Sequence, residues 1–226
     1  GRWQAVLLHV FLPWLLGSAL TAHSSWQRAA GAGFATAAVS AVAPILIPAL
    51  VVGWTVLVLV RGWANPLRAV LGTLPLALAP TIVWWLPRFG APGDIALLPG
   101  IGRFFADPGV GQTGGSADWW WYLLGWPELP GDLALAGLTI TFSTFVLWCV
   151  VPVLALALAV FATSRSDAHI IFGVTVAVGL VTAAMAPLIG QGYAGLEPIT
   201  VWSGSGVMVV SLGVVAAAAA TLDALS

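Results

Sequence analysis

The strongest constraint on the fold of this chain is a series of long apolar stretches that carry almost no charge. Of its 226 residues, 60% are hydrophobic and only 7% are charged, and the mean hydropathy is +1.03. Soluble domains carry about a quarter charged residues, so this composition cannot cover a water-exposed surface. Seven basic and eight acidic side chains nearly cancel, which excludes the one-sided positive charge of a nucleic-acid-binding surface. The composition therefore predicts an integral membrane protein.

Six of these stretches are long enough to cross a bilayer as helices. A hydrocarbon core about 30 Å thick needs about 20 apolar residues of helix. The stretches that qualify are Gln4–Ala22, Ala29–Val60, Leu67–Leu86, Leu133–Phe161, Ile170–Ile189 and Ser205–Ala224. None shows the alternation of membrane β-strands. We expect an all-α, polytopic helical bundle of about six spans, with residues 1–226 forming a single transmembrane domain whose partner is the lipid bilayer.

The second stretch is too long for one straight span. It has about 32 residues, which correspond to about 48 Å of helix at 1.5 Å per residue. Pro44 and Pro48 lie in its middle, and each proline removes a backbone hydrogen bond from a helix. We therefore expect the second span to be broken at Pro44/Pro48, with a short, re-entrant segment before Pro44 and a full span after it.

The placement of the arginines predicts the orientation. If six spans alternate, one side of the membrane receives Arg2, Arg61, Arg68 and Arg165, and the other receives Arg28, Arg88 and Arg103. Cytoplasmic loops are enriched in basic residues, and long loops count little. The first side is therefore predicted to be cytoplasmic, with both termini there. Residues 87–132 then form one long extracytoplasmic loop, and the shorter loop Gln191–Gly204 faces the same side.

The interiors of the spans contain a single ionisable residue, His9. Buried ionisable groups mark ion paths and proton relays, so their scarcity disfavours an ion-coupled transporter or a voltage sensor. His9 itself is interpreted as a hydrogen-bond donor between helices. The single cysteine, Cys149, allows no disulfide within the chain. No Asp-x-Asp motif occurs, so we expect neither a metal site nor a cofactor.

The loop of residues 87–132 holds the polar and aromatic residues from which a site could be built. Its candidate substrate-binding residues are Arg88, Arg103, Asp118, Trp119, Trp120, Trp121 and Trp126. Amphipathic rings prefer the level of the lipid headgroups, so one interpretation of the tryptophans is an interfacial anchor. The other is a stacking platform for sugar rings or a polyprenyl-linked substrate, with Asp118 and Glu128 beside it to accept hydroxyl protons.

Three short motifs carry a resemblance to a known family. They are Asp107-Pro108-Gly109-Val110, Leu123-Leu124-Gly125-Trp126-Pro127 and Val201-Trp202-Ser203-Gly204-Ser205-Gly206, the last leading into an alanine-rich helix that ends near Asp223. Over most of the chain from Phe105 onward, this order resembles the membrane region of large actinobacterial family 2 glycosyltransferases. The resemblance implies a bacterial plasma-membrane protein whose soluble glycosyltransferase domain lies elsewhere in the parent chain. The start at Gly1, without methionine, also predicts a piece of a larger polypeptide.

Three functions are compatible with these observations. The first is the membrane domain of a cell-envelope glycosyltransferase in polysaccharide biosynthesis, which anchors the enzyme and holds or passes a lipid-linked glycan acceptor. No catalytic residue is assigned, because the metal-binding Asp-x-Asp of that family is absent here. The second is a transporter or permease subunit with a cavity near Pro44 and Pro48. The third is a membrane transferase with a polyprenyl-phosphate sugar donor, whose phosphate Arg88 or Arg103 would hold.

Overall fold

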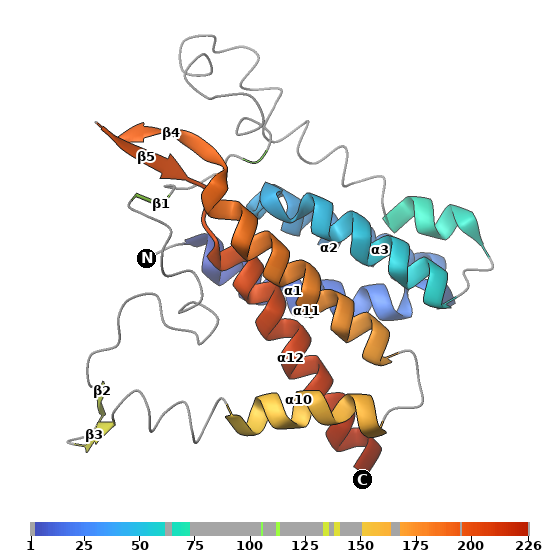
Figure 1. The fold of residues 1–226 in the computed structure, drawn as a ribbon. Helices are drawn as coiled ribbons and strands as arrows, with labels where there is room; N and C mark the ends of the chain where they lie inside the picture. Colours follow the sequence, from blue (N-terminus) through green and yellow to red (C-terminus); the bar gives the residue numbers. More distant parts are fainter. Residues whose placement is uncertain are drawn as a thin grey trace.

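The computed structural model of this chain is a bundle of helices (Figure 1). It describes residues 3–61, 65–72, 105, 112–113, 133–135, 138–140, 151–163, 168–194 and 196–225. The labelled helices are α1 (Trp3–Thr21), α2 (Trp26–Val42), α3 (Ile47–Arg61), α10 (Val151–Thr163), α11 (Ala168–Met185) and α12 (Gly204–Leu225). A further short helix covers residues 66–72. The prediction of a helical bundle is confirmed at this level.

Within the described ranges, four helical segments are long and apolar enough to cross a membrane. They are Trp3–Ser24, Pro44–Arg61, His169–Leu188 and Gly204–Leu225. Each overlaps one of the stretches selected from the sequence, because length and apolar composition alone decide whether a helix can span the hydrocarbon core. These four segments fit a membrane-embedded protein, whereas the count of six spans stays a prediction.

The second apolar stretch forms two helices that fold back on each other. Helix α2 ends at Val42, a short 3-10 helix covers Pro44–Leu46, and α3 follows. The indole Nε1 of Trp54 on α3 donates a hydrogen bond of 3.1 Å to Oγ1 of Thr36 on α2. In one straight helix, residues 18 positions apart lie about 27 Å apart. The two helices therefore form a hairpin.

The proline prediction is thus confirmed at Pro44, where the chain turns. Pro48 lies in the first turn of α3, where a missing N–H costs no helical hydrogen bond, so it adds no second break. The segment before Pro44 is a 17-residue helix, about 25 Å long, and not the short segment expected. Its first turn is capped by Ser25, whose side chain accepts a hydrogen bond of 3.3 Å from the backbone N–H of Arg28.

Two clusters of buried apolar side chains mark the two ends of the bundle. The first joins Leu8 of α1 and Leu46 of the turn to Trp202, just before α12. The second joins Ala22 and Leu57 to Phe172 near the start of α11 and to Ala217 and Ala218 in the last part of α12. We call the end with the first cluster the hairpin end, because the turn between α2 and α3 lies there. We call the end with the second cluster the arginine end, after the arginines described below.

The hairpin adds a reversal of the chain before Arg61 that the sequence did not predict. Helix α1 begins at the hairpin end, whereas α12 ends at the arginine end (Figure 1). Trp3 and Leu225 therefore lie toward opposite ends of the described bundle, while the side of the membrane assigned to each terminus stays a prediction. For the same reason, Arg28 lies at the same end as Arg61 and Arg68, and not opposite them as predicted.

The fourth apolar stretch is the main local difference from the prediction. It was expected to be a helical span from Leu133 to Phe161, with a kink at Pro152 or a start outside the membrane as alternatives, but Leu133–Leu135 (β2) and Leu138–Ile140 (β3) form an antiparallel pair. The β-branched Thr139 and Ile140 favour a strand over a helix. Helix α10 (Val151–Thr163) lies across α12, where Thr221 Oγ1 donates a hydrogen bond of 2.8 Å to the carbonyl of Leu156.

The hairpin end carries a small antiparallel sheet of three strands. Strand β4 (Gly190–Ala194) pairs with β5 (Glu197–Thr200), and β5 pairs with β1 (Gln112–Thr113). Phe105 also packs against the buried cluster at this end. Two points of the long loop 87–132 therefore lie beside the shorter loop before α12, at one end of the bundle.

Candidate functional site

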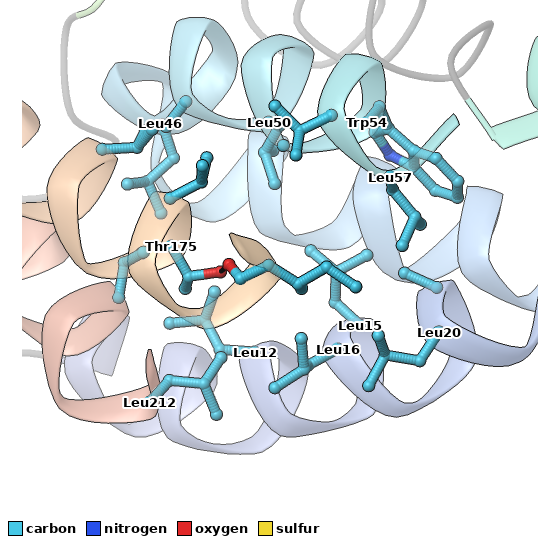
Figure 2. Close-up of a pocket in the computed structure, with 18 residues that line it drawn as sticks. Leu12, Leu15, Leu16, Leu20, Leu46, Leu50, Trp54, Leu57, Thr175 and Leu212 are labelled. Atoms are coloured by element: carbon cyan, nitrogen blue, oxygen red, sulfur yellow. Dashed lines mark hydrogen bonds between the residues drawn. The ribbon is translucent and has the colours of Figure 1, made fainter. Parts of the chain in front are cut away.

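The described helices enclose one candidate site, an apolar cavity between α1, α3, α11 and α12. Its volume is about 110 Å³, and it is partly open to the outside of the bundle. In Figure 2, leucines of α3 and α1 point toward each other across it. The lining residues are Leu12, Leu15, Leu16, Ala19, Leu20, Leu46, Ala49, Leu50, Gly53, Trp54, Val56, Leu57, Ile171, Val174, Thr175, Val178, Val209 and Leu212.

The lining offers hydrocarbon and almost nothing else. Its one hydroxyl, that of Thr175, donates a hydrogen bond of 2.8 Å to the carbonyl of Ile171 in its own helix. The indole N–H of Trp54 is directed away to Thr36. Because a water molecule in a cavity needs two to four polar partners, this cavity suits an apolar occupant. For comparison, a leucine-lined cavity of about 150 Å³ holds benzene, so a segment of a hydrocarbon chain fits here.

Gly53 lies on the rim of this cavity and widens its opening. The residue is exposed, and a Cβ built on it would meet no atom within 4 Å. A glycine at this point leaves a gap between the side chains of α3 that any other residue would narrow. The rim at Gly53 is therefore the place where the cavity can be closed by substitution without a clash.

The arginine end of the bundle carries three arginines, which are all the arginines that the structure describes. Arg68 donates a hydrogen bond from Nη1 to the carbonyl of His23, and its guanidinium lies 5.5 Å from the ring centroid of Trp26. Such a contact is a cation–π interaction. Nε of Arg68 is buried and has no hydrogen-bond partner among the described residues. Arg28 donates from Nη1 to Oγ of Ser24 at 3.1 Å.

On both α3 and α1, the residues that line the cavity continue toward the arginine end of the bundle. On α3, Gly53 and Leu57 line the cavity, and Arg61 follows at the same spacing of four residues. Side chains four residues apart lie on one face of a helix, so exposed Arg61 continues the cavity-lining face by one turn. On α1, Leu16 and Leu20 line the cavity, one turn before the segment that contacts Arg68.

The residues predicted from the sequence as a substrate site lie outside the described residues. These are Arg88, Arg103, Asp118, Trp119, Trp120, Trp121 and Trp126. Their roles as an interfacial anchor, a stacking platform or a phosphate site stay predictions. Neither the cavity nor the arginine end was predicted from the sequence. The available signals were the leucines at four-residue spacing in the first stretch and Arg61 directly after the second.

His9, the ionisable residue expected to bond between helices, bonds within its own helix. Its Nδ1 lies 2.8 Å from the carbonyl of Ala5, four residues earlier, and the side chain is exposed. Because a carbonyl oxygen only accepts hydrogen bonds, Nδ1 carries the proton. The interpretation of His9 as an interhelical donor is therefore wrong. In the part of the chain that the structure describes, no three His, Cys, Asp or Glu side chains gather as a metal site would require.

Comparisons with protein-family models, with curated proteins and with solved structures found no match to this chain. The features that bear on function are therefore the cavity, the arginine end and the three sequence motifs between Asp107 and Gly206.

Proposed function

We propose that this chain is the membrane domain of a cell-envelope glycosyltransferase, and that its cavity holds a segment of the hydrocarbon chain of a lipid-linked glycan acceptor. The observation that carries the proposal is the apolar lining between α1, α3, α11 and α12. A cavity without polar partners gains free energy from an apolar occupant, by about 25 cal/mol for each Å² of apolar surface removed from water. The motifs from Asp107 to Gly206 support the glycosyltransferase assignment.

We propose further that the arginine end faces the cytoplasm and the hairpin end faces outward across a bacterial plasma membrane. Basic residues are enriched on the cytoplasmic side, and Arg28, Arg61 and Arg68 share one end. A cytoplasmic transferase domain of the parent chain would then meet its lipid-linked acceptor at the arginine end. The aromatic loop 87–132, two points of which lie at the hairpin end, would be extracytoplasmic.

The chemistry of the cavity favours this proposal over a transporter. Transporter sites near the membrane midplane are built from polar groups and broken helices, whereas no lining residue here is ionisable. The turn at Pro44 does break a helical stretch, but Pro44, Ile45 and Leu46 are buried there. The one hydroxyl of the lining, that of Thr175, bonds to its own helix and offers nothing to a polar solute. The alternative of a polyprenyl-phosphate sugar donor held by Arg88 and Arg103 concerns residues outside the described ranges.

The proposal is tested by closing the cavity at its rim. We expect Gly53→Leu to place its side chain over the opening and to lower cross-linking of a polyprenol that carries a diazirine in its tail. Losing the burial of two or more CH₂ groups corresponds to about tenfold weaker binding. The measurement is the yield of photo-cross-linked full chain in nanodiscs, with the labelled peptides mapped by mass spectrometry.

Gly17→Leu is the matched control for this experiment. Gly17 is also a helical glycine, and a Cβ added to it would likewise meet no atom within 4 Å, but it lies outside the cavity lining. Cross-linking should be unchanged in this variant, and both variants should unfold at the same temperature. Equal labelling of Gly53→Leu and the wild type, or labels that map away from the four cavity helices, would contradict the proposal.

A further inference from the structure

Two arginines, Arg61 and Arg68, follow the last cavity-lining residues of α3 and α1 at the arginine end. On α3 the lining ends at Leu57, and Arg61 follows one helical turn later on the same face. On α1 the lining ends at Leu20, and three residues further on the carbonyl of His23 accepts a hydrogen bond from Arg68. The lining thus ends one helical turn before Arg61 on α3 and three residues before the carbonyl that Arg68 contacts.

Both arginines retain hydrogen-bonding capacity for a ligand. Arg61 is exposed, and within the described residues it has neither a hydrogen bond nor an ion pair from its side chain. Arg68 uses one nitrogen for His23, while its buried Nε has no partner there. A guanidinium has five N–H donors in a fork that matches the oxygens of a phosphate. The exposed donors of Arg61 therefore suit an anionic partner with several acceptor oxygens, and Arg68 adds a second positive charge at the same end.

The helical segment 66–72, which carries Arg68, packs on α3 through Gly72 and Trp54. A side-chain carbon at Gly72 would lie only 2.7 Å from the Trp54 ring, so this helix packs directly on a residue that lines the cavity. Arg68 precedes Gly72 by four residues and therefore lies on the same helical face. The guanidinium of Arg68 makes a cation–π contact with the ring of Trp26, and this contact keeps its positive charge at the surface of the bundle.

From this arrangement we infer that the site takes a single-chain lipid with a phosphate headgroup, with the chain in the cavity and the phosphate on Arg61 and Arg68. The inference rests on the proposed function, because it assumes that the cavity binds a hydrocarbon chain. It adds the headgroup chemistry and the end of the bundle at which the headgroup lies. A cavity enclosed by four helices and about 110 Å³ in volume admits a segment of one chain, which disfavours a two-chain phospholipid.

The test compares polyprenyl phosphate with the uncharged polyprenol of the same length. Binding to the full chain is measured in nanodiscs of phosphatidylcholine, which brings no net charge of its own. We expect the phosphate to bind about tenfold or more tightly than the alcohol, since hydrogen bonds to charged groups are worth that much. In Arg61→Gln this difference should largely disappear, while binding of polyprenol stays as in the wild type. Arg61→Lys should keep part of it, because lysine retains the charge but loses the fork.

Arg28→Gln is the matched control, because it removes an arginine from the same end. Arg28 belongs to α2, which does not line the cavity, and its guanidinium bonds to Ser24. An equal loss of phosphate preference in Arg28→Gln and Arg61→Gln would overturn the inference and indicate diffuse charge. Arg68→Gln serves as a second arm, accompanied by a melting curve since Arg68 also contacts His23 and Trp26.

The remaining outcomes separate this inference from the proposed function. If polyprenol binds as tightly as its phosphate, and Arg61→Gln has no effect, the headgroup site is refuted while the hydrocarbon cavity stands. If neither lipid binds, both proposals fail. Displacement of polyprenyl phosphate by inorganic phosphate alone would overturn the inference by showing an ion site independent of the chain. Displacement by an equal amount of phosphatidylglycerol would overturn the single-chain assignment.

Discussion

Two neighbouring faces of helix α11 differ in how closely other helices approach them. On one face, a side-chain carbon added at Gly179 would lie 2.8 Å from the backbone nitrogen of Val210 on α12, so the two helices meet at backbone contact. On the other, Val174 and Val178 line the cavity. Both faces are apolar, so composition does not separate them.

The difference teaches what holds this bundle together. In a membrane, helices associate mainly through close packing, which small residues permit, and α11 and α12 have glycines where they touch. Where leucines of α1, α3 and α12 meet the branched side chains of α11, the bulk of these side chains keeps the backbones apart and leaves a cavity. Stability is therefore expected to reside in the glycine contact and the buried clusters, and ligand binding in the leucine-lined region. Three experiments test this division, in order of decreasing effect.

The largest effect is expected from a pair of leucines one turn apart on α1. Leu8 is fully buried in the core and lies outside the cavity lining, whereas Leu12 lines the cavity. Leu8→Ala should cost about 2–5 kcal/mol, the usual range for a packed leucine. Leu12→Ala should cost less, because a side chain beside a void has already lost contacts. Unfolding in detergent measures both, and equal costs would contradict the looser packing around the cavity.

An intermediate effect is expected at the contact of α11 with α12. In Gly206→Ala, the new Cβ would lie 2.4 Å from the backbone nitrogen of Ala183 and 2.6 Å from the carbonyl oxygen of Gly179. Backbone atoms cannot move aside as side chains do, so we expect a loss of about 1–3 kcal/mol and a lower melting temperature. Gly17→Ala, which has open space, should instead be neutral or raise stability by up to about 1 kcal/mol.

The smallest effect is expected from Thr175→Val within the cavity. The hydroxyl of Thr175 bonds only to its own helix, so its removal leaves one helical carbonyl with its ordinary backbone partner and makes the lining wholly apolar. The melting temperature should change by less than that of either leucine variant, and binding of a tail-labelled polyprenol should be equal or slightly tighter. A marked loss of binding would indicate that the occupant is polar at this point, against the hydrocarbon assignment.

The elements of the fold could be predicted where length and hydropathy decide the outcome. Segments α1, α3, α11 and α12 each overlap a predicted stretch, and Pro44 marks the position of the break. The direction of the chain after Pro44 could not be predicted, because a proline interrupts a helix without setting the angle that follows. That angle depends on the contact between Trp54 and Thr36, which are 18 residues apart.

The candidate site was harder to predict than the helices. In an apolar stretch, the leucines that face a cavity have the same composition as those that face lipid or a packed neighbour. Leu8 and Leu12 look alike in the sequence, although only Leu12 lines the cavity. The tryptophans and charges of residues 87–132 stand out chemically, and they were therefore the predicted site. The role of Arg61 depends on which helical face the cavity occupies, and only the packing of four helices defines that face.

The hairpin also has a consequence for how the chain enters the membrane during synthesis. Helix α2 has 17 residues and is buried along a face of small and hydroxyl residues, with Thr36 and Ser40 inside. On this face, Thr36 accepts a hydrogen bond from the indole N–H of Trp54 on α3. At 5–20 residues per second, translation of residues 43–61 takes about 1–4 seconds. Until α3 has been synthesised, Thr36 lacks the indole N–H that it accepts in the bundle, so the buried face of α2 is completed only after this interval.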